Sequence, residues 1–290
     1  MPLIFKGNEE TAYRDPTAFF FNNKCYLFYT LSLKRDGYMF NHIAVSESAD
    51  LIHWTNPRIL TSTDRYLNYS SPGNIIGTED GYLLCFCSYP MPETLDKMTC
   101  ADGTARLFYM KTTDFVNFSS PERIYPKGRD CPFEKEGRMI DPYILHVSDM
   151  YYLYYKADGI SFSSSVDLVN WNYLGRRSGG ENVCVIDYKG GFRMLHSPAD
   201  GIGIMDSSDS LNWVDKGMLD IDKKALGIAD GRLTAGFALP HELNGGKGWL
   251  LFFHQSKKDS YPETHGSASL VCVFTEDFSR FVFDFEGLND

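Results

Sequence analysis

The sequence predicts an all-β fold, a five-bladed β-propeller with four antiparallel strands per blade. Two observations predict it. A turn motif, in which an acidic residue is followed four residues later by Trp or Phe, occurs five times along the 290 residues, and a predicted β-hairpin precedes each copy. Helical periodicity is almost absent. Repeats of a few tens of residues that each form a small sheet are typical of propellers, whose blades surround a central channel.

The five turn motifs set the order of the blades. Their acidic and aromatic residues are Asp50 with Trp54, Asp114 with Phe118, Asp167 with Trp171, Asp209 with Trp213, and Asp277 with Phe281. Each copy indicates a turn followed by another strand, and we expect its tryptophan to pack between blades. No linker separates the modules, so we expect one domain over residues 1–290. A β-sandwich with coincidental spacing is the alternative fold.

A short apolar run near one end of the chain, residues 2–6 or 281–285, is expected to pair across the ring and close it. The sequence does not indicate which of the two runs does so.

The inner strands supply the main functional signal. In four blades, the residue that opens the first strand lies 11 residues before a Tyr or Phe of the second; in the fifth, the insertion "PHELNGGKG" lengthens this distance to 17. The innermost strands of a propeller line its channel. We therefore expect the five opening residues to ring one mouth of the channel: Asp15, Ser71, Asp141, Glu181 and Arg232.

The path of the chain predicts which loops surround these carboxylates. Loops between second and third strands, and loops between blades, should lie on the carboxylate face, whereas the short hairpin turns should lie on the opposite face. The three long loops, residues 89–105, 125–139 and 255–267, all fall on the carboxylate face. Long loops without structure of their own are usually functional or disordered. We expect them to form the walls of a pocket.

Composition excludes several classes of function. A net charge of −10 disfavours binding to a phosphate backbone, so no nucleic-acid partner is expected. No apolar run approaches 18 residues and no export signal is visible, so we expect neither a membrane span nor a signal peptide. Seven irregularly spaced cysteines predict reduced thiols and a cytoplasmic location.

Two of the cysteines lie two residues apart on one expected strand. Cys85 and Cys87 could chelate a metal, but no second Cys or His pair has the spacing of a zinc site. We expect both to be buried apolar residues.

Three carboxylates on one rim fit the cleavage of a glycosidic bond. That reaction requires two carboxyl groups beside the bond, one acting as an acid and the other as a base or nucleophile. The acid needs a raised pKa, which a third carboxylate nearby can provide by like-charge repulsion. Three carboxylates could equally hold a divalent cation. No EF-hand, GxxxxGK[ST] loop, GxSxG elbow or HExxH helix is present.

Four short segments carry a resemblance to a known family: "RDP" at residues 14–16, "IDP" at 140–142, "GGENVCVIDYKGGFRMLHS" at 179–197, and "KGWLLFFH" ending at His254. In order and spacing they resemble the five-bladed propeller glycosidases, most closely glycoside hydrolase family 43, over essentially the whole chain. Related families 32, 62, 68, 117 and 130 share the architecture. The resemblance implies that Asp15 is a general base that activates water, that Asp141 raises the pKa of the acid, and that Glu181 is the general acid. It also implies inversion of configuration.

The chain departs from the family pattern in two places. The fifth inner strand, "GRLTAGFALP", lacks the His that helps to hold a channel metal in the family, so we expect no cofactor and no structural calcium. The second blade has "YSSPGN" where the family usually has Trp-Ala-Pro.

Six further residues are predicted to contact substrate: Arg232, His254, Ser71, Arg14, Tyr69 and His196. Several of them have a structural alternative. Arg232 could balance the charge of the carboxylates, and His196 and His254 could be hydrogen-bonded residues at the edge of the core.

The expected function is removal of a terminal arabinofuranose or xylose residue from an oligosaccharide. A retaining, fructosidase-like reaction, as in families 32 and 68, is an alternative, although the chain has no "NDPNG"-like opening. A phosphorylase of the family 130 type would need a phosphate site, for which only Arg14 and Arg232 are available. A catalytically silent sugar-binding propeller is the alternative from another class. Pattern alone leaves the oligomeric state open.

Overall fold

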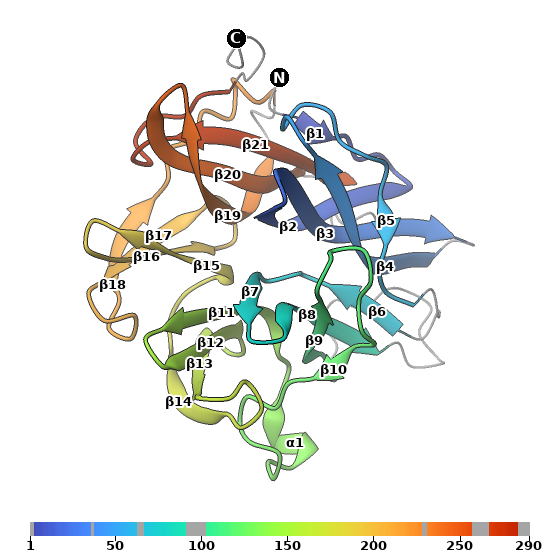
Figure 1. Ribbon diagram of the computed structural model, residues 1–290, viewed down its shortest axis with the longest axis vertical. Helices are drawn as coiled ribbons and strands as arrows, with labels where there is room; N and C mark the ends of the chain where they lie inside the picture. The colour runs from blue at the N-terminus through green and yellow to red at the C-terminus, as the bar shows by residue number, and fades with distance from the viewer. Residues whose placement is uncertain are drawn as a thin grey trace.

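Five small sheets surround a central axis (Figure 1). This computed structural model describes residues 3–35, 38–62, 67–90, 103–227, 231–256 and 267–283. Each sheet is a blade with four antiparallel strand positions, so the predicted five-bladed β-propeller is confirmed. The one helix within the described ranges, α1 (Phe133–Glu136), has four residues, and no described helix is long and apolar enough to cross a membrane.

The blades follow one another along the chain, and within blades 1 to 4 the strands run in order from the channel outwards. Blade 1 has β2 (Thr11–Phe21), β3 (Lys24–Arg35), β4 (Tyr38–Ser48) and β5 (Arg58–Ile59). Blade 2 has an inner strand in two parts, β6 (Leu67–Ser70) and β7 (Ile75–Thr78), then β8 (Gly81–Pro90), β9 (Arg106–Thr112) and β10 (Glu122–Arg123). Blade 3 has β11 (Ile140–Val147), β12 (Met150–Lys156), β13 (Ile160–Ser165) and β14 (Asn172–Arg177).

The last two blades complete the ring. Blade 4 has β15 (Glu181–Tyr188), β16 (Gly191–Ser197), β17 (Gly203–Ser207) and β18 (Val214–Met218). Blade 5 has β19 (Arg232–Leu243), β20 (Gly246–Ser256) and β21 (Ser269–Thr275), and its outer strand is β1 (Leu3–Phe5). Of the two apolar runs near the ends, the N-terminal one therefore closes the ring. In the register of this closure, Leu3 lies opposite Val271 and Phe5 opposite Leu270.

The five acidic motifs form one kind of turn after the third strand of each blade. In blade 3, Asp167 Oδ1 accepts hydrogen bonds from the backbone N–H groups of Val169 and Asn170, at 2.9 and 2.7 Å, and Trp171 Nε1 donates to the carbonyl of Leu168. Leu168 has φ 63°, which the turn requires. Asp50, Asp114 and Asp209 accept the same pair of backbone hydrogen bonds, and Asp277 accepts one, from Ser279, which confirms the predicted turns.

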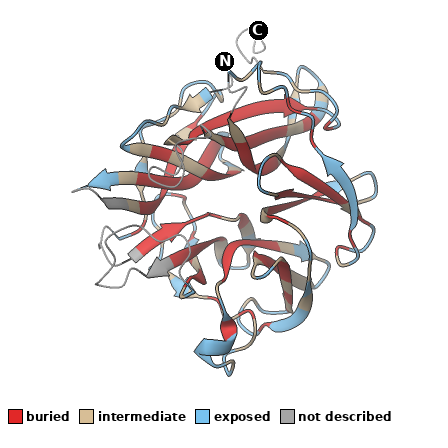
Figure 2. Ribbon diagram, turned by 180° about the vertical axis from the view of Figure 1, so that it is seen from behind, coloured by how far each residue is buried: buried red, intermediate tan, exposed pale blue. Residues whose placement is uncertain are grey.

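Burial follows position within each blade (Figure 2). Every residue of β21 is buried, whereas every residue of β18, an outer strand, is exposed. Trp171 and Trp213 are buried in the apolar clusters between blades, and Trp54 packs against the same core, as expected. The core therefore lies between neighbouring sheets, where each blade covers the face of the next.

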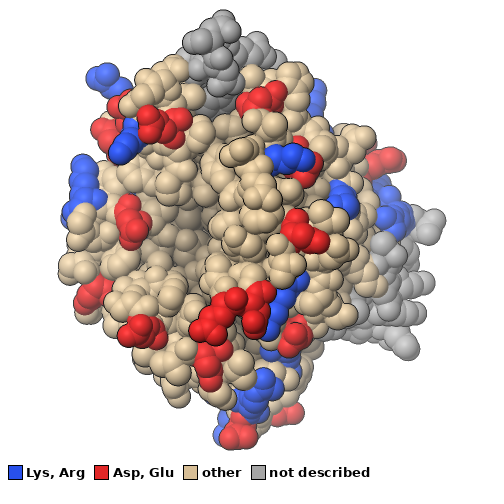
Figure 3. Space-filling view, in the orientation of Figure 1, with Lys and Arg blue, Asp and Glu red and all other residues tan. Residues whose placement is uncertain are grey.

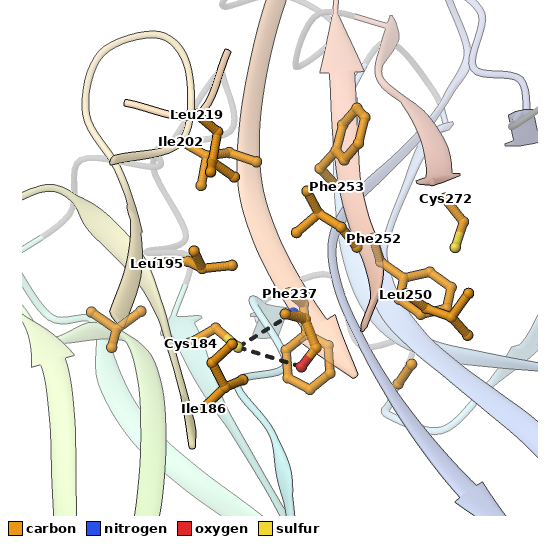
Figure 4. Packing of buried hydrophobic residues seen from close by; sticks show 14 of the residues in the cluster. Cys184, Ile186, Leu195, Ile202, Leu219, Phe237, Leu250, Phe252, Phe253 and Cys272 are labelled. Carbon is orange, nitrogen blue, oxygen red and sulfur yellow. Dashed lines mark hydrogen bonds between the residues drawn. The ribbon is translucent and has the colours of Figure 1, made fainter. Parts of the chain in front are cut away.

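Polar side chains also join neighbouring inner strands. The side chain of Asn74 connects blade 2 to blade 3. Its Oδ1 accepts from the N–H of Ile144 at 2.8 Å, and its Nδ2 donates to the carbonyl of Ile144 at 2.7 Å. Cys184 connects blade 4 to blade 5, because its Sγ accepts from the N–H of Ala238 at 3.4 Å (Figure 4). Cys85 and Cys87 are buried free thiols, as predicted, and each also donates a hydrogen bond to a backbone carbonyl.

One of the three long loops is fully described. The 125–139 loop contains α1 and is held by Glu136, a buried carboxylate that accepts from Arg106 Nε at 2.8 Å and also bonds Arg123. Residues 91–102 and 257–266, the central parts of the other two loops, lie outside the described residues.

Candidate active site

Each inner strand is interrupted at one place. In blade 1, Arg14 pairs with Thr30 and Thr17 with Phe28, so two residues lie opposite one. Blades 3, 4 and 5 have the same two-against-one bulge. In blade 2, Ser70 pairs with Cys87 and Ile75 with Leu84, so the break is longer. Such bulges bend a strand and redirect a side chain, and they are frequent beside active sites.

The first residue of every break has a left-handed backbone. These residues and their φ angles are Asp15 at 50°, Ser71 at 52°, Asp141 at 54°, Asn182 at 52° and Ala235 at 58°. Such angles are uncommon outside glycine, and five non-glycine residues adopt them at equivalent positions. All five line one cavity at the channel, together with the residues that follow them.

Two of the expected opening residues do not occupy this position. The first residue of the bulge is Asn182 in blade 4 and Ala235 in blade 5, so Glu181 lies one residue before it and Arg232 three residues before it. The equivalence predicted for Glu181 and Arg232 was therefore wrong. Asp15 is equivalent but does not open its strand, since β2 begins at Thr11.

Hydrogen-bond donors from three blades surround the buried carboxylate of Asp15. Its Oδ2 accepts from the Thr30 hydroxyl at 2.9 Å and from the Ser71 hydroxyl at 3.3 Å. Its Oδ1 accepts from Asn182 Nδ2 at 3.5 Å. The Thr30 hydroxyl in turn accepts from the backbone N–H of Ser71 at 2.7 Å, which orients its proton toward the carboxylate.

His254 supports Asp15 from blade 5. Its Nδ1 accepts from the backbone N–H of Asp15 at 3.1 Å, and its Nε2 lies 2.8 Å from the hydroxyl of Thr234. Burial lowers the pKa of His254 to about 3, although the charge of Asp15 opposes this shift. The ring is therefore neutral near pH 7, and it holds the backbone at Asp15 rather than forming an ion pair with the carboxylate.

Asp141 is a buried carboxyl with a strongly raised pKa. Burial, together with the charges of Glu181 and Asp15, raises this pKa to about 8. A hydrogen bond from Ser71 and the positive charge of Arg138 oppose the rise in pKa. Since Asp141 interacts with both other carboxylates, the three groups titrate together, and the group as a whole retains a proton near neutral pH.

The remaining predicted residues, Tyr69, His196, Arg232 and Arg14, do not line this cavity. Tyr69 is buried and packs against Phe86, at 5.8 Å between ring centroids. His196 is also buried, and its Nδ1 accepts from the N–H of Gly180 at 3.1 Å, which is the structural alternative expected for it. Arg232 Nε donates to the carbonyl of Ala199 at 3.0 Å. Arg14 precedes Asp15 directly, and its charge, like that of Arg232, helps to lower the pKa of His254.

Sequence reasoning missed two residues that contact Asp15, Thr30 and Asn182. Thr30 lies on the second strand of blade 1 and has no motif to mark it. Asn182 had a signal that could have been used, because it follows Glu181 directly and asparagine is enriched at positive φ.

Among the described residues that line the cavity, blade 5 offers no side-chain ligand to a metal in the channel. Blade 5 presents Ala235 and Gly236 to the cavity, and neither has a side chain that could be a ligand. Among the residues that the structure describes, no group of three or more His, Cys, Asp and Glu side chains has the arrangement of a metal site.

A second cavity of about 720 Å³ lies farther along the inner strands, and Phe237 lines both cavities. It is lined by later residues of these strands, such as Tyr143, Asp187 and His241, and by Trp249. Figure 3 shows a hollow near the middle of one face of the molecule, with acidic and basic side chains scattered around it.

Solved structures with the same fold come from several glycosidase families. An exo-β-1,3-galactanase from Clostridium thermocellum has a TM-score of 0.68 and 12% identity, over 98% of this chain and 66% of its own. A family 117 glycoside hydrolase from Zobellia galactanivorans has a TM-score of 0.65 and 16% identity, over 92% and 86%. A family 43 β-1,3-galactosidase, solved with galactodeoxynojirimycin, has a TM-score of 0.64 and 11% identity, over 96% and 97%. At these identities the likeness establishes the fold.

The class of protein that emerges is a propeller glycosidase of the family 43 type. A family model described as "Probable glycosyl hydrolase domain", related to glycoside hydrolase family 43, matches residues 32–185, more than half of the chain. The chain belongs to this family, which confirms the resemblance seen in the sequence. No curated protein sequence matches the chain.

Proposed function

We propose that this glycosidase removes a terminal sugar from an oligosaccharide with inversion of configuration. The observation that carries the proposal is the convergence of Asp15 and Asp141 on one cavity, with Glu181 close enough to raise the pKa of Asp141. Acid–base cleavage of a glycosidic bond requires one ionised and one protonated carboxyl group, and a proton shared between Asp141 and Glu181 can supply the second.

Each carboxyl group has a separate role in this reaction. Asp15, whose carboxylate accepts hydrogen bonds from neutral hydroxyl and amide groups, activates a water molecule. Glu181, half-buried at the start of β15, protonates the leaving oxygen. Asp141 and Glu181 repel each other when both are ionised, so the two share one proton, and Asp141 acts on the acid through this repulsion.

Arabinofuranose, xylose and galactose are the proposed sugars. The first two follow from the family resemblance. Galactose is added because two of the solved structures with this fold are a β-1,3-galactosidase and an exo-β-1,3-galactanase.

The first experiment is hydrolysis of aryl glycosides of arabinofuranose, xylose, galactose and fructose. We expect turnover of at least one of the first three, and a loss of about 10²–10⁴-fold in Asp15→Ala and Glu181→Ala. Asp149→Ala, in the exposed β11–β12 turn, is the matched control and should retain full activity. Turnover of none, or turnover that neither variant reduces, would defeat the roles proposed for the two carboxylates.

The leaving group separates the two roles. A good leaving group needs little protonation, so Glu181→Ala should lose much less activity on a dinitrophenyl glycoside than on an oligosaccharide. Asp15→Ala should lose similar activity on both. NMR of the first-formed anomer then tests inversion, and a retained anomer would favour the fructosidase-like alternative instead. Sugar binding without turnover would favour the silent binding propeller.

A further inference from the structure

Asn182 occupies the bulge position of blade 4, which in blades 1 and 3 carries an aspartate. Its side chain is an amide, and Nδ2 points to Asp15 Oδ1 across the channel at 3.5 Å. The other carboxylate oxygen, Oδ2, has two hydroxyl donors, from Thr30 and Ser71. A further polar group, His254 Nδ1, is 3.6 Å from Oδ1 but already accepts the backbone N–H of Asp15.

We propose that Asn182 is a positioning residue for the base: its amide orients Asp15 Oδ1, the oxygen that takes the proton from water. This inference rests on the proposed function. The two hydroxyls at Oδ2 restrain rotation of the carboxylate on one side. The amide restrains the other side and leaves a second lone pair of Oδ1 free for water. A base held in this way attacks along a defined direction.

The amide has an alternative explanation in the backbone. Asparagine tolerates positive φ better than most residues, and Asn182 has φ 52°. Asn182→Gly separates the two explanations, because glycine adopts this backbone without strain but carries no amide. Asn244→Gly is the matched control, since Asn244 has the same φ of 52° in the exposed β19–β20 turn.

The charged and titratable groups around Asp15 come from several elements. Asp15 interacts electrostatically with Cys87 on β8, Asp141 on β11 and His254 on β20. Behind these groups, Glu181 on β15 acts on Asp141, and Arg14 on β2 and Arg232 on β19 act on His254. Loss of a neutral amide donor changes none of these charges. It removes one hydrogen bond that favours the ionised form of the base, so the acidic limb of the pH–rate profile should move to higher pH.

The experiment measures kcat, KM and the pH profile on the aryl glycoside that the wild-type protein hydrolyses fastest. For Asn182→Gly we expect kcat to fall by about 10²-fold, KM to stay within about two-fold, and the acidic limb to move upward. Asn182→Asp keeps the size of the side chain but replaces a donor with an acceptor, and it should lose at least as much. Wild-type kinetics in Asn182→Gly, or a rise in KM with an unmoved acidic limb, would overturn the positioning role.

A second measurement does not depend on activity. The ¹³C signal of the Asp15 carboxyl, assigned by its loss in Asp15→Asn, can be followed against pH in each protein. Its midpoint should move to higher pH in Asn182→Gly and stay in place in Asn244→Gly. An unmoved midpoint overturns the proposal even if the protein hydrolyses sugars. A moved midpoint without any turnover supports the contact and counts against the proposed function alone.

Discussion

Asp141 shows how one side chain can couple the site to the stability of the whole fold. Burial and two neighbouring carboxylates raise its pKa to about 8, far above the value near 4 of an unfolded aspartate. Between these two values the folded protein binds more protons than the unfolded chain. The contribution of Asp141 to stability is therefore present below about pH 4 and is lost as the pH rises toward 8.

Asp141→Asn should reverse this loss. The variant has no ionisable group at position 141, so it does not lose this contribution as the pH rises. The difference in free energy of unfolding, variant minus wild type, should therefore be higher at pH 8 than at pH 5. Urea unfolding at both pH values measures the difference. Asp114→Asn is the control, because hydrogen bonds lower the pKa of Asp114 to about 2 and both pH values lie above it. An unchanged difference for Asp141→Asn would contradict the raised pKa.

Spacing alone identified Asp15, Ser71 and Asp141 correctly as equivalent, but it failed by one residue at Glu181. The alignment assumed that Phe192 matches Tyr26. In the structure, Tyr26 lies opposite Phe19, four residues after the bulge position, whereas Phe192 lies opposite Asp187, five residues after it. Residues alternate between the two faces of a strand, so this single step places the two aromatic rings on opposite faces. An aromatic spacing cannot reveal such a step.

At the scale of the strand, blades 2 and 3 approach each other very closely beside the site. Gly73 lies two residues after Ser71, the bulge position of blade 2. A Cβ added to Gly73 would lie 1.5 Å from the carbonyl oxygen of Pro142. Pro142 directly follows Asp141. The absence of a side chain at Gly73 therefore allows the two inner strands to approach at the level of the carboxylates.

Gly73→Ala should disturb both stability and activity. The added methyl group must displace the backbone at Pro142, which we expect to cost about 1–3 kcal/mol and to move Asp141. Gly77→Ala is the matched control on β7, because a Cβ there meets nothing within 4 Å. Thermal unfolding and aryl glycoside hydrolysis of both variants check the expectation. Equal behaviour of the two variants would show that the contact at Gly73 can relax.

At the scale of the whole molecule, β1 joins the first residues of the chain to its last blade. Phe5 lies opposite Leu270, and its ring stacks on Tyr13 of blade 1 at 5.0 Å between centroids. One aromatic residue therefore contacts both blades that meet at the closure of the ring. A propeller depends on such closure, because an open first or last blade leaves a strand edge unpaired.

Phe5→Ala should weaken this closure. We expect a loss of roughly 1–3 kcal/mol, together with a lower unfolding temperature. Leu3→Ala tests the same strand at an exposed position, and it should cost much less because Leu3 is already 37% exposed. If the two variants unfold alike, the aromatic contact contributes little and the hydrogen bonds of β1 alone close the ring.

The fold was predictable from the sequence because every blade contains the same short turn motif. The aspartates of the turn motifs satisfy backbone N–H groups within three residues, so each copy leaves a visible pattern. The contacts of the site are different in kind. Thr30, Ser71 and Asn182 reach Asp15 from 15, 56 and 167 residues away. Thr30 reaches Asp15 through the pairing of β2 with β3, whereas Ser71 and Asn182 reach it only because their blades surround the same channel.

The five bulges have a consequence for engineering. In every blade the direction of the first bulge residue is set by the backbone, so its identity can change while the strand ladders on either side are kept. Nature has placed Asp, Ser, Asp, Asn and Ala at these five sites. Ala235 presents the smallest group, and it faces a cavity that the polar residues of the other four sites also line. Substitutions at these five positions would therefore change the chemical groups that face the cavity, one blade at a time.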